Sequence, residues 1–515
     1  MTGMVYLIGA GPGDYKLITV KGRECIEKAD VIVYDYLADE HLLRWARPDA
    51  ELIYAGKQCK HHTLHQYEIN ELLVKFGKAG KIVARLKGGD PLIFGRGGEE
   101  ALELAKAGVP FEFVPGVTSG ISAPAYAGIP VTQRAMATSF AIVTGHEDPT
   151  KNESGINWQG LATSVDTISF VMGVGNLPMI SQKLMEYGRS KDTPVAVIRW
   201  GTKPIQETLI STLEHVAEDV KKAGIKPPSI ITVGNVVNLR ESLRWFDNKP
   251  LFGKTIMVTR ARAKASVLSE QLEALGANVI EAAAIKTQAL PLERKTEDVL
   301  LKAHSFKTVI FTSAEGVRYF FQALQTMGKD SRVLGQAKLC AIGSATAKAL
   351  QAKGLLADIV PADYKGESVV KALQAVLKEG DKVLLIQPKV ARQVIYNGLT
   401  EGGIDVTVAR LYETLVDESQ ATTLQEALQT DTVDYITFTS SSTVTNTLKL
   451  LGPKGKELLK KAKVACIGPI TAATCVEQGI EPDLISDTFT IPAMVAMIQA
   501  DATKDMATKD MPAKA

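Results

Sequence analysis

The chain has 515 residues, of which 45% are hydrophobic and 23% are charged, and its formal net charge is +2. A chain of this length exceeds what one hydrophobic core supports, so we expect about two to four domains. The composition is that of an ordinary soluble globular protein, and the near-neutral charge excludes recruitment of nucleic acid or membrane by a global electrostatic field. Any anionic ligand must therefore be met by local arginine and lysine side chains.

The number and spacing of the cysteines indicate the redox state of the cellular compartment in which the protein is located. The chain has five cysteines, an odd number with no C-x-x-C pair, and they are Cys25, Cys59, Cys340, Cys466 and Cys475. This pattern predicts a reducing compartment and neither a structural zinc site nor a disulfide framework. No stretch approaches the roughly 20 apolar residues of a membrane span, and no basic region precedes the first apolar run. We therefore expect a cytoplasmic protein with no membrane partner.

The first predicted strand runs into the glycine-rich turn GAGPGD, which contains Gly9, Gly11 and Gly13. A dinucleotide fingerprint, G-x-G-x-x-G, would place its third glycine at Asp14, where a carboxylate would repel a pyrophosphate. Pro12 also interrupts the turn. The turn is therefore not an NAD fingerprint, and either a plain strand-to-helix turn or another adenosyl-binding loop is possible.

Short apolar runs alternate with helical patterns along the whole chain, which predicts an α/β fold. The runs MVYLIGA, VIVYD, AELIYA, KIVARL and FEFVPG precede Pro130, and the runs SFAIVTG, TISFVMG, TPVAVIRWG and SIITVGNVV follow it. The breakers in FDNKPLFGK indicate a linker, and the polar TKDM repeat at the C-terminus indicates disorder. We expect a first domain at 1–245 with lobes at about 1–134 and 135–245, a linker at 246–253, a second domain at 254–500 and a disordered tail at 501–515.

The second half contains an internal repeat. VIFTSAEGV resembles YITFTSSSTV, which aligns Ser313 with Ser440 at an offset of 127 residues. LCAIGSATAKAL resembles VACIGPITAATC at an offset of 125, and GANVIEAAAIKT resembles GIDVTVARLYET at an offset of 127. Three matches at nearly one offset predict two similar α/β lobes, and clefts between such lobes bind small molecules.

In the first half, glycine-rich segments follow several strands. Gly88, Gly89 and Asp90 follow KIVARL, and PGVTSG brings Thr118 and Ser119 after FEFVPG. Tight turns with capping residues would explain each segment alone. Several such loops at the carboxyl ends of strands favour a bound ligand.

The motifs GAGPGD, VIVYDYL, YAGK, RLKGGDPLIFGRGGEE, PGVTSG and AYAGIPVTQR occur in this order within residues 3–245. They resemble the S-adenosylmethionine-dependent tetrapyrrole methyltransferases, specifically the uroporphyrinogen-III C-methyltransferases. The resemblance implies a two-lobed methylase fold, S-adenosylmethionine as methyl donor, no NAD, and a homodimer through this half. Carried over by motif, the donor would contact Pro12, Gly88, Gly89, Asp90, Ile93, Thr118, Ser119, Met172 and Gly201.

The same resemblance implies that Asp35 in VYDYL and Lys57 in YAGK form the acid/base pair. When a pyrrole carbon attacks the methyl group, positive charge develops on the ring and a proton must leave, so a carboxylate such as Asp35 suits the reaction. Lys57 would donate a proton or bind a substrate carboxylate. A helix cap and a solvated lysine are the structural alternatives. Further anion partners for the eight substrate carboxylates would be Arg85, Lys87, Arg96 and Arg134.

The second half, from about 251 to 500, resembles uroporphyrinogen-III synthase in PLFGKTIMVTR, FTSAEGV, AIGSATAKAL, YET, FTSSSTV and CIGPITAAT. The resemblance implies that one lobe combines 251–285 with 417–500 and that the other spans about 290–412. It makes Tyr412 the residue that assists loss of the substrate hydroxyl as water. Hydroxyl groups and backbone amides at strand ends would hold the substrate carboxylates, and the side chains are Thr312, Ser313, Thr346, Thr439, Ser440 and Thr471. The alternative for each is a turn or helix cap.

Together the two resemblances imply a bifunctional enzyme of tetrapyrrole biosynthesis. It would cyclise hydroxymethylbilane to uroporphyrinogen III and methylate that product at C-2 and C-7 to give precorrin-2, on the route to sirohaem or cobalamin. The alternatives are a related corrin-precursor methylase and a second half that only binds tetrapyrrole. The failed fingerprint disfavours a nicotinamide oxidoreductase. No metal is expected, because the histidines of HHTLH have no carboxylate or cysteine nearby in sequence.

Overall fold

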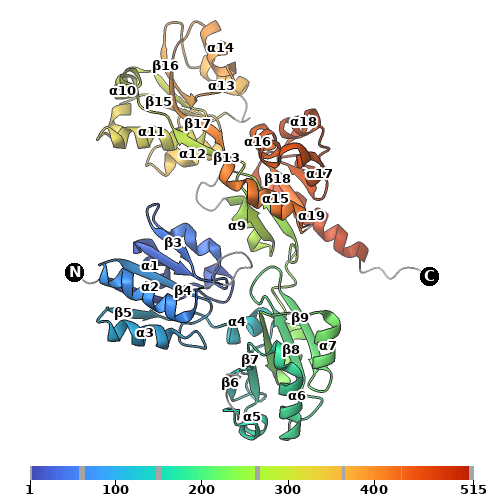
Figure 1. The fold of residues 1–515 in the computed structure, drawn as a ribbon. Helices are drawn as coiled ribbons and strands as arrows, with labels where there is room; N and C mark the ends of the chain where they lie inside the picture. The colour runs from blue at the N-terminus through green and yellow to red at the C-terminus, as the bar shows by residue number, and fades with distance from the viewer. Residues whose placement is uncertain are drawn as a thin grey trace. The chain divides into compact units, whose positions relative to one another are not determined.

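The computed structural model describes residues 3–56, 64–146, 154–260, 267–361, 366–430 and 432–509, with side chains up to residue 504. Within these ranges the strands form four five-stranded sheets (Figure 1). The chain divides into two compact units. The first comprises 1–255, 271–279 and 499–515, and the second comprises 256–270 and 280–498.

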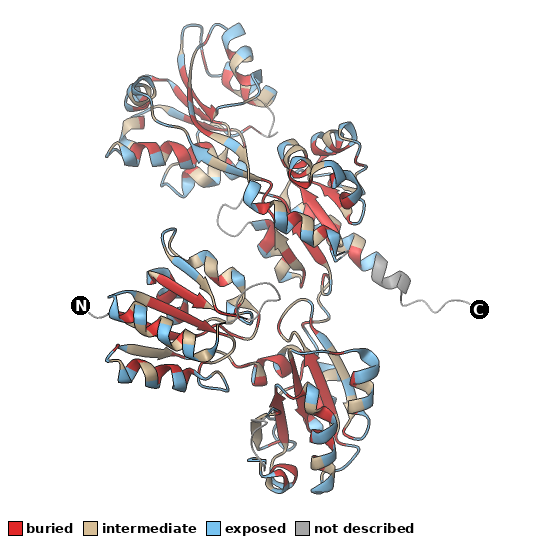
Figure 2. Ribbon diagram, in the orientation of Figure 1, coloured by how far each residue is buried: buried red, intermediate tan, exposed pale blue. Residues whose placement is uncertain are grey.

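The first sheet is entirely parallel, with the strand order β3-β2-β4-β1-β5. Its elements are β1 (Met4–Gly9), α1 (Val20–Lys28), β2 (Val31–Tyr34), β3 (Glu51–Tyr54), α2 (Gln66–Lys78), β4 (Ile82–Lys87), α3 (Gly97–Lys106) and β5 (Phe111–Val114). Leu7 packs on one face with residues of α2 and α3, and Ile8 packs on the other face with α1. Because both faces are covered, the central strands β1, β2 and β4 are largely buried, as Figure 2 shows, whereas the edge strands β3 and β5 are more exposed.

The second sheet is mixed, with the order β6-β7-β10-β8-β9. Only β6 and β7 pair in parallel, and the other neighbours are antiparallel. Its elements are α4 (Ser119–Tyr126), β6 (Phe140–Thr144), α5 (Trp158–Ser164), β7 (Thr167–Val171), α6 (Leu177–Glu186), β8 (Pro194–Arg199), β9 (Glu207–Thr212), α7 (Val216–Ala223), β10 (Ser229–Val233) and α8 (Arg240–Leu243). Helix α4 lies within the predicted first lobe, yet Ala123 packs against Val171, Ile198 and Ile230 of the second sheet.

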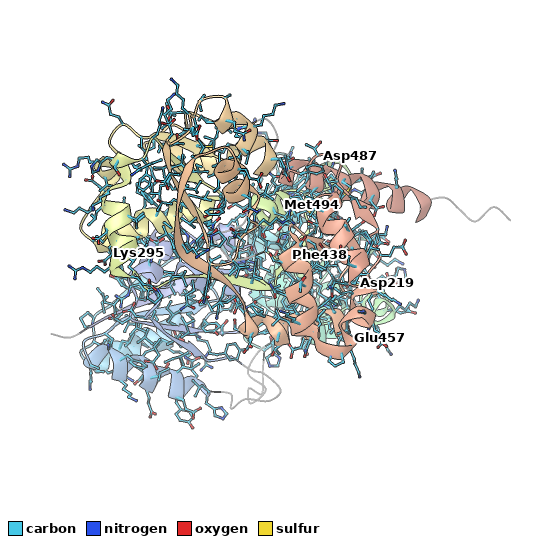
Figure 3. All side chains as sticks on the ribbon, turned by 90° about the horizontal axis from the view of Figure 1, so that it is seen from above. Asp219, Lys295, Phe438, Glu457, Asp487 and Met494 are labelled. Carbon is cyan, nitrogen blue, oxygen red and sulfur yellow. The ribbon has the colours of Figure 1, made fainter. Side chains whose placement is uncertain are left out.

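The third sheet, with the order β12-β11-β18-β19-β20, takes strands from both ends of the second half. Its elements are β11 (Thr255–Val258), α9 (Val267–Ala274), β12 (Asn278–Glu281), α15 (Ala421–Gln429), β18 (Tyr435–Phe438), α16 (Ser441–Leu451), α17 (Gly455–Leu459), β19 (Lys463–Cys466), α18 (Pro469–Glu477), β20 (Leu484–Ile485) and α19 (Ile491–Lys509). Phe438 and Met494 are fully buried here, and Figure 3 shows both among packed side chains.

The fourth sheet has the order β13-β17-β16-β14-β15. Its elements are β13 (Ile285–Ala289), α10 (Arg294–Leu301), β14 (Thr308–Phe311), α11 (Ala314–Thr326), β15 (Lys338–Ala341), α12 (Ser344–Gln351), α13 (Gly366–Gln374), β16 (Lys382–Pro388), α14 (Val394–Glu401) and β17 (Asp405–Val416). Its strands all come from 285–416, whereas the third sheet uses 255–281 and 435–485. This arrangement confirms the predicted crossing of the chain between two α/β lobes.

Short 3₁₀ helices lie at Tyr15–Leu17, Glu40–Trp45, Val174–Asn176, Asn235–Leu239, Ala303–Ser305, Ser331–Leu334, Glu418–Gln420 and Gly452–Lys454. Among the described residues, the longest and most apolar helices still fall short of what a bilayer crossing requires. The α/β fold class predicted from the sequence is confirmed by the four sheets.

The C-terminal segment differs from the prediction. Helix α19 continues to Lys509, so the predicted disorder is wrong for 501–509, while 510–515 lie outside the described residues. Met494, Ile498 and Ala502 are buried at a spacing of four residues, which anchors one face of the helix. Alanine, methionine and lysine in this segment also have high helix propensity. The polar TKDM repeat therefore predicted disorder in a segment where the structure shows helix α19 continuing.

Candidate active sites

Three glycine-rich loops meet at the carboxyl edge of the first sheet. Gly11 and Gly89 exchange two backbone hydrogen bonds, with N···O distances of 3.2 Å from Gly11 to Gly89 and 2.7 Å from Gly89 to Gly11. A Cβ atom on Gly9 would lie 2.5 Å from the Cα of Gly116, so the loop after β5 approaches the end of β1 without room for a side chain. The glycines thus let three strand ends form one backbone surface.

This surface forms one wall of a cavity of about 350 Å³. The residues predicted from the sequence that line it are Pro12, Gly88, Gly89, Ser119, Met172 and Gly201. Gly11 of the GAGPGD turn also lines it. The lining residues that the sequence did not suggest are Leu37, Ala123, His146, Val171, Val174, Ile198, Trp200, Lys203, Pro227, Pro228, Ser229 and Ile230. The lining is mostly apolar, with a few hydroxyl and backbone groups, as is usual for a small-molecule site.

Segments of the second sheet that line or adjoin the cavity contain strained backbone. Met172, Trp200 and Thr202 have φ angles of 57°, 49° and 74°, in the left-handed region that non-glycine residues rarely adopt. Met172 and Trp200 line the cavity, and Thr202 follows Gly201. Such conformations persist where packing fixes them, and they cluster at ligand sites.

Asp14 connects the loop after β1 with the second sheet's segments. Its carboxylate accepts hydrogen bonds from the Lys16 amide at 2.9 Å and from the Tyr126 hydroxyl at 2.8 Å. Its own amide donates to the Thr202 hydroxyl at 3.0 Å. The residue that breaks the dinucleotide fingerprint therefore fixes the loop that carries Pro12.

In the second half, the repeat positions have matching local structure. Ser313 and Ser440 are N-caps of α11 and α16, with φ, ψ angles of −167°, 160° and −166°, 158°. Gly343 and Gly468 stand at the N-caps of α12 and α18.

Of the other hydroxyl residues predicted to bind substrate carboxylates, Thr312 donates to the Ile386 carbonyl at 3.0 Å, and Thr439 is half-buried. Thr346 and Thr471 are buried in the first turns of α12 and α18.

Tyr412 lies in β17 and is buried. Its hydroxyl is hydrogen-bonded to the Ser313 hydroxyl, with 2.8 Å between the oxygens, and Ser313 also accepts from the Gly316 amide at 2.9 Å. Burial raises the pKa of Tyr412, as do Glu315 and Tyr319, while the Ser313 hydrogen bond and the Arg318 charge lower it. The phenol therefore remains protonated at neutral pH and is available as a proton donor.

Comparison with known proteins agrees with the division of the chain into two halves with different sites. Residues 4–217 match the family model of Tetrapyrrole (Corrin/Porphyrin) Methylases, and residues 266–496 match that of Uroporphyrinogen-III synthase HemD. The Porphyrin biosynthesis protein HemD of Ruminiclostridium josui is 36% identical over 494 residues, which cover 96% of this chain and 97% of that protein. A Uroporphyrinogen-III C-methyltransferase of Bacillus subtilis is 44% identical over 374 residues, covering 73% of this chain and 76% of that protein.

The chain belongs to the uroporphyrinogen-III C-methyltransferase family and carries a fused uroporphyrinogen-III synthase. A further relative, the S-adenosyl-L-methionine-dependent uroporphyrinogen III methyltransferase of Methanosarcina barkeri, is 49% identical over 241 residues, which cover 47% of this chain and 94% of that protein. The bifunctional prediction therefore holds, and a methylase with a merely binding second half is not favoured.

In the methyltransferase half, Asp35 follows β2 beside the cavity-lining Leu37. One carboxylate oxygen accepts from the Leu37 amide at 3.1 Å, and the other accepts from the Arg85 guanidinium at 3.3 Å. The side chain is 26% exposed, so it remains accessible to a ligand. Lys57, its predicted partner, lies outside the described residues.

Arg85 and Lys87 are buried, although the sequence predicted that both meet substrate carboxylates. Arg85 donates to the Leu86 carbonyl at 2.9 Å and approaches Glu100 at 3.4 Å, and Lys87 donates to Glu100 at 2.6 Å. Burial and the charge of Arg85 lower the pKa of Lys87, against the effect of Glu100. In this structure Arg85 contacts both Asp35 and the buried Glu100, whereas Lys87 contacts Glu100, so the hydrogen bonds of both cations stay inside the protein.

The other predicted anion partners are on the surface. Arg96 is exposed and pairs with Glu99 at 2.6 Å, and Arg134 is exposed. Their contact with substrate stays a prediction.

Asp90, Thr118 and Ile93 do not line the cavity, although the sequence predicted that they touch the methyl donor. The Asp90 carboxylate accepts from the amides of Leu92 at 2.8 Å and Gly116 at 2.9 Å, so it fixes two of the loops. Thr118 is the buried N-cap of α4, and Ile93 is 41% exposed.

Proposed function

We propose that the cavity of the methyltransferase half holds S-adenosylmethionine. The observation that carries the proposal is the paired Gly11–Gly89 backbone, which presents a surface without side chains to a cavity of about 350 Å³. Ser119, at the first turn of α4, offers a hydroxyl group beside this surface. The similarity to the S-adenosyl-L-methionine-dependent methyltransferase of Methanosarcina barkeri supports the same donor.

The residues present fit such a ligand. Apolar groups such as Leu37, Val171 and Ile198 suit the adenine and the carbon chain, and the glycine loops suit close backbone contact. S-adenosylmethionine supplies an electrophilic methyl group when bound. Asp35 then stabilises the positive charge that develops on the pyrrole ring and accepts the proton that the methylated ring loses. Arg85 holds the Asp35 carboxylate in place.

The finer substrate assignment follows from the two fused activities. Uroporphyrinogen III made by the synthase half is the acceptor of the methyltransferase half, and methylation at C-2 and C-7 gives precorrin-2. The product then enters the route to sirohaem or cobalamin. Arg96 and Arg134 would meet substrate carboxylates at the protein surface.

In the synthase half, we propose that Tyr412 assists ring closure. The carbon–oxygen bond of the substrate hydroxymethyl group breaks, and the oxygen leaves as water with a proton donated by the Tyr412 hydroxyl. The pyrrole nitrogen stabilises the methylene cation that remains, a carbon of the terminal pyrrole forms the new bond to it, and the closed ring releases a proton to solvent. The resulting phenolate is stabilised by the Ser313 hydroxyl at 2.8 Å and is reprotonated by solvent. The remaining hydroxyls and helix N-termini orient a flexible octacarboxylate so that its ends meet.

The test uses the full purified chain with hydroxymethylbilane, with and without S-adenosylmethionine. Chromatography should show uroporphyrinogen III without the donor and a dimethylated product with it. Isomer I alone, formed at the uncatalysed rate, would contradict the synthase assignment. Formation of isomer III without methylation, under saturating donor, would contradict the donor site.

A further inference from the structure

The surroundings of Tyr412 in the fourth sheet contain a second tyrosine. The rings of Tyr319, in α11, and Tyr412, in β17, stack with centroids 5.0 Å apart and an interplanar angle of 12°. The guanidinium of Arg318 lies 4.0 Å from the centroid of the Tyr319 ring. Tyr319 and Tyr412 are both buried, so the two rings pack as one unit.

The hydroxyl of Thr287 fixes this unit from the neighbouring strand β13. Tyr319 and Arg318 each donate to the Thr287 oxygen at 3.1 Å, and Thr287 donates to Glu315 at 3.2 Å. Glu315 also pairs with Arg318 at 2.6 Å. The Tyr319 hydroxyl, Thr287, Arg318 and Glu315 are therefore joined in one network, which restricts rotation of the Tyr319 ring.

The internal repeat supplies an independent comparison. Thr287 pairs directly with Thr414 in the antiparallel β13/β17 ladder, and Ile285 and Ala289 pair with Val416 and Tyr412. Adding the repeat offset of 127 residues to Ile285 and Ala289 gives Tyr412 and Val416, which are the ladder partners of Ala289 and Ile285. The two strands of this ladder are therefore the two copies of one repeated segment, paired with each other.

The repeats differ at the stack. In α16, which packs with the third sheet, the positions equivalent to Glu315, Arg318 and Tyr319 are Ser442, Thr445 and Asn446. Within the fourth sheet itself, the position equivalent to Tyr412 is Ile285 of β13. The N-cap serines are retained in both lobes, whereas the aromatic and charged residues occur in one lobe only. If the two lobes only held substrate carboxylates, in the same way, they would not need different residues at these positions. A proton donor, in contrast, is needed at one place only.

We propose that Tyr319 is a positioning residue of the synthase reaction, which holds the Tyr412 ring so that its hydroxyl faces the departing substrate hydroxyl. The lobe built on the fourth sheet therefore performs the elimination of water, and the lobe built on the third sheet contributes binding. This inference rests on the role proposed for Tyr412. Tyr319 itself donates no proton to substrate, because its hydroxyl is used by Thr287.

The test compares Tyr319→Leu, which removes the stack, with Tyr319→Phe, which keeps the ring and loses only the Thr287 hydrogen bond. Asn446→Ala, at the equivalent place in the other repeat, is the matched control. Each full-length variant is assayed with hydroxymethylbilane alone, and the rate, KM and isomer ratio are measured across pH. For Tyr319→Leu we expect a kcat at least about tenfold lower with KM within about twofold, whereas Tyr319→Phe and Asn446→Ala stay within about threefold of the parent.

The pH profile separates positioning from a merely structural role. The groups that face Tyr412 are Ser313, Glu315, Arg318 and Tyr319. Removing the Tyr319 ring exposes the phenol and lowers its raised pKa, so the alkaline limb of the rate profile should move to lower pH in Tyr319→Leu. A structural role would lower the melting temperature and leave this limb and the isomer ratio unchanged, which would overturn the inference.

A variant that does not fold is replaced by Thr287→Val, which keeps a β-branched residue in the strand. It removes the acceptor of both Tyr319 and Arg318 and the donor to Glu315, so it loosens the stacked unit more than Tyr319→Phe does. It should lower kcat by about two- to fivefold at constant KM. Parental kcat and pH profile in Thr287→Val would overturn the inference. If the parent chain itself yields only isomer I, the proposed synthase function fails instead, so the two failures are distinguishable.

Discussion

Gly201 lies so close to Ala123 that a Cβ atom on Gly201 would stand 2.4 Å from the Cβ of Ala123. Ala123 belongs to α4, which is packed on the second sheet, and Gly201 follows β8. Both residues line the cavity of the methyltransferase half. Because the backbone of a packed helix cannot yield by such an amount, this contact sets the width of the cavity at that point.

Gly201→Ala should therefore weaken binding of S-adenosylmethionine and lower the free energy of unfolding by about 1–3 kcal/mol, the usual cost of overpacking. Isothermal titration calorimetry and urea unfolding measure the two effects. Gly175→Ala is the matched control, because a Cβ atom there has no neighbour within 4 Å. Donor affinity that is equal in Gly201→Ala and the parent would show that the donor binds elsewhere.

Asp35→Asn should reduce methylation by about 10²- to 10⁴-fold, the contribution expected of a general base, because the amide cannot accept the proton. Donor binding should remain within about twofold of the parent, since the shape beside Leu37 is kept. Cyclisation of hydroxymethylbilane by the same chain provides an internal control for folding. Methylation of uroporphyrinogen III at the parental rate would remove Asp35 from the mechanism.

The sequence predicted the part of this site that depends on backbone geometry. Pro12, Gly88 and Gly89 could be found because glycine-rich turns at strand ends leave a clear pattern. Trp200 and Pro228, which also line the cavity, could not be found in this way. The pairing of β8 with β10 brings them to the cavity, and neither residue belongs to a glycine-rich turn.

Burial explains most of the remaining differences. The sequence counts Arg85 as a cation, but it does not show that the side chain is buried against Glu100 and Asp35. Likewise, the alignment of Thr287 with Thr414 revealed a repeat, but only the strand register shows that the two residues pair directly. Residue type and spacing therefore predicted the features that depend on local chemistry. The features that depend on long-range packing, such as burial and strand register, became visible only in the structure.

Acid should weaken the contact of Asp39 with Lys203, whose charged atoms lie 3.2 Å apart. Burial alone would raise the pKa of Asp39, but the His41 hydrogen bond at 2.7 Å and the Lys203 charge outweigh it and lower the pKa to about 2. A depressed carboxyl pKa contributes stability that is present above the unfolded value near 4 and is lost as pH falls towards 2. The shift corresponds to about 2 kcal/mol at neutral pH.

Asp39→Asn should therefore lower the free energy of unfolding of the methyltransferase half at pH 7, measured by urea titration. The effect of the substitution on this free energy should become progressively smaller between pH 4 and pH 3. Asp192→Asn, at an exposed position, serves as the control and should change this free energy little at either pH. An Asp39→Asn effect of the same size at pH 3 and pH 7 would show that the carboxylate charge is not what stabilises this contact.

In the synthase half, Tyr412→Phe should slow formation of uroporphyrinogen III by about 10- to 100-fold, because the phenol that donates a proton to the leaving hydroxyl is lost. The ring remains stacked on Tyr319, and Ser313 still accepts from the Gly316 amide, so the fold should survive. The variants Thr346→Ala and Thr471→Ala remove hydroxyls at equivalent buried positions of α12 and α18. Since many donors share the orientation of the substrate, each threonine change should cost less than about threefold.

Initial rates and the ratio of isomers III and I, measured by chromatography of the oxidised products, compare the three variants directly. Tyr412→Phe should release more isomer I, because the uncatalysed closure of hydroxymethylbilane competes with a slower enzymatic step. The threonine variants should retain the parental ratio, since they leave the proton donor in place. A loss in Thr346→Ala or Thr471→Ala as large as that in Tyr412→Phe would mean that substrate orientation, and not proton donation by Tyr412, limits the reaction.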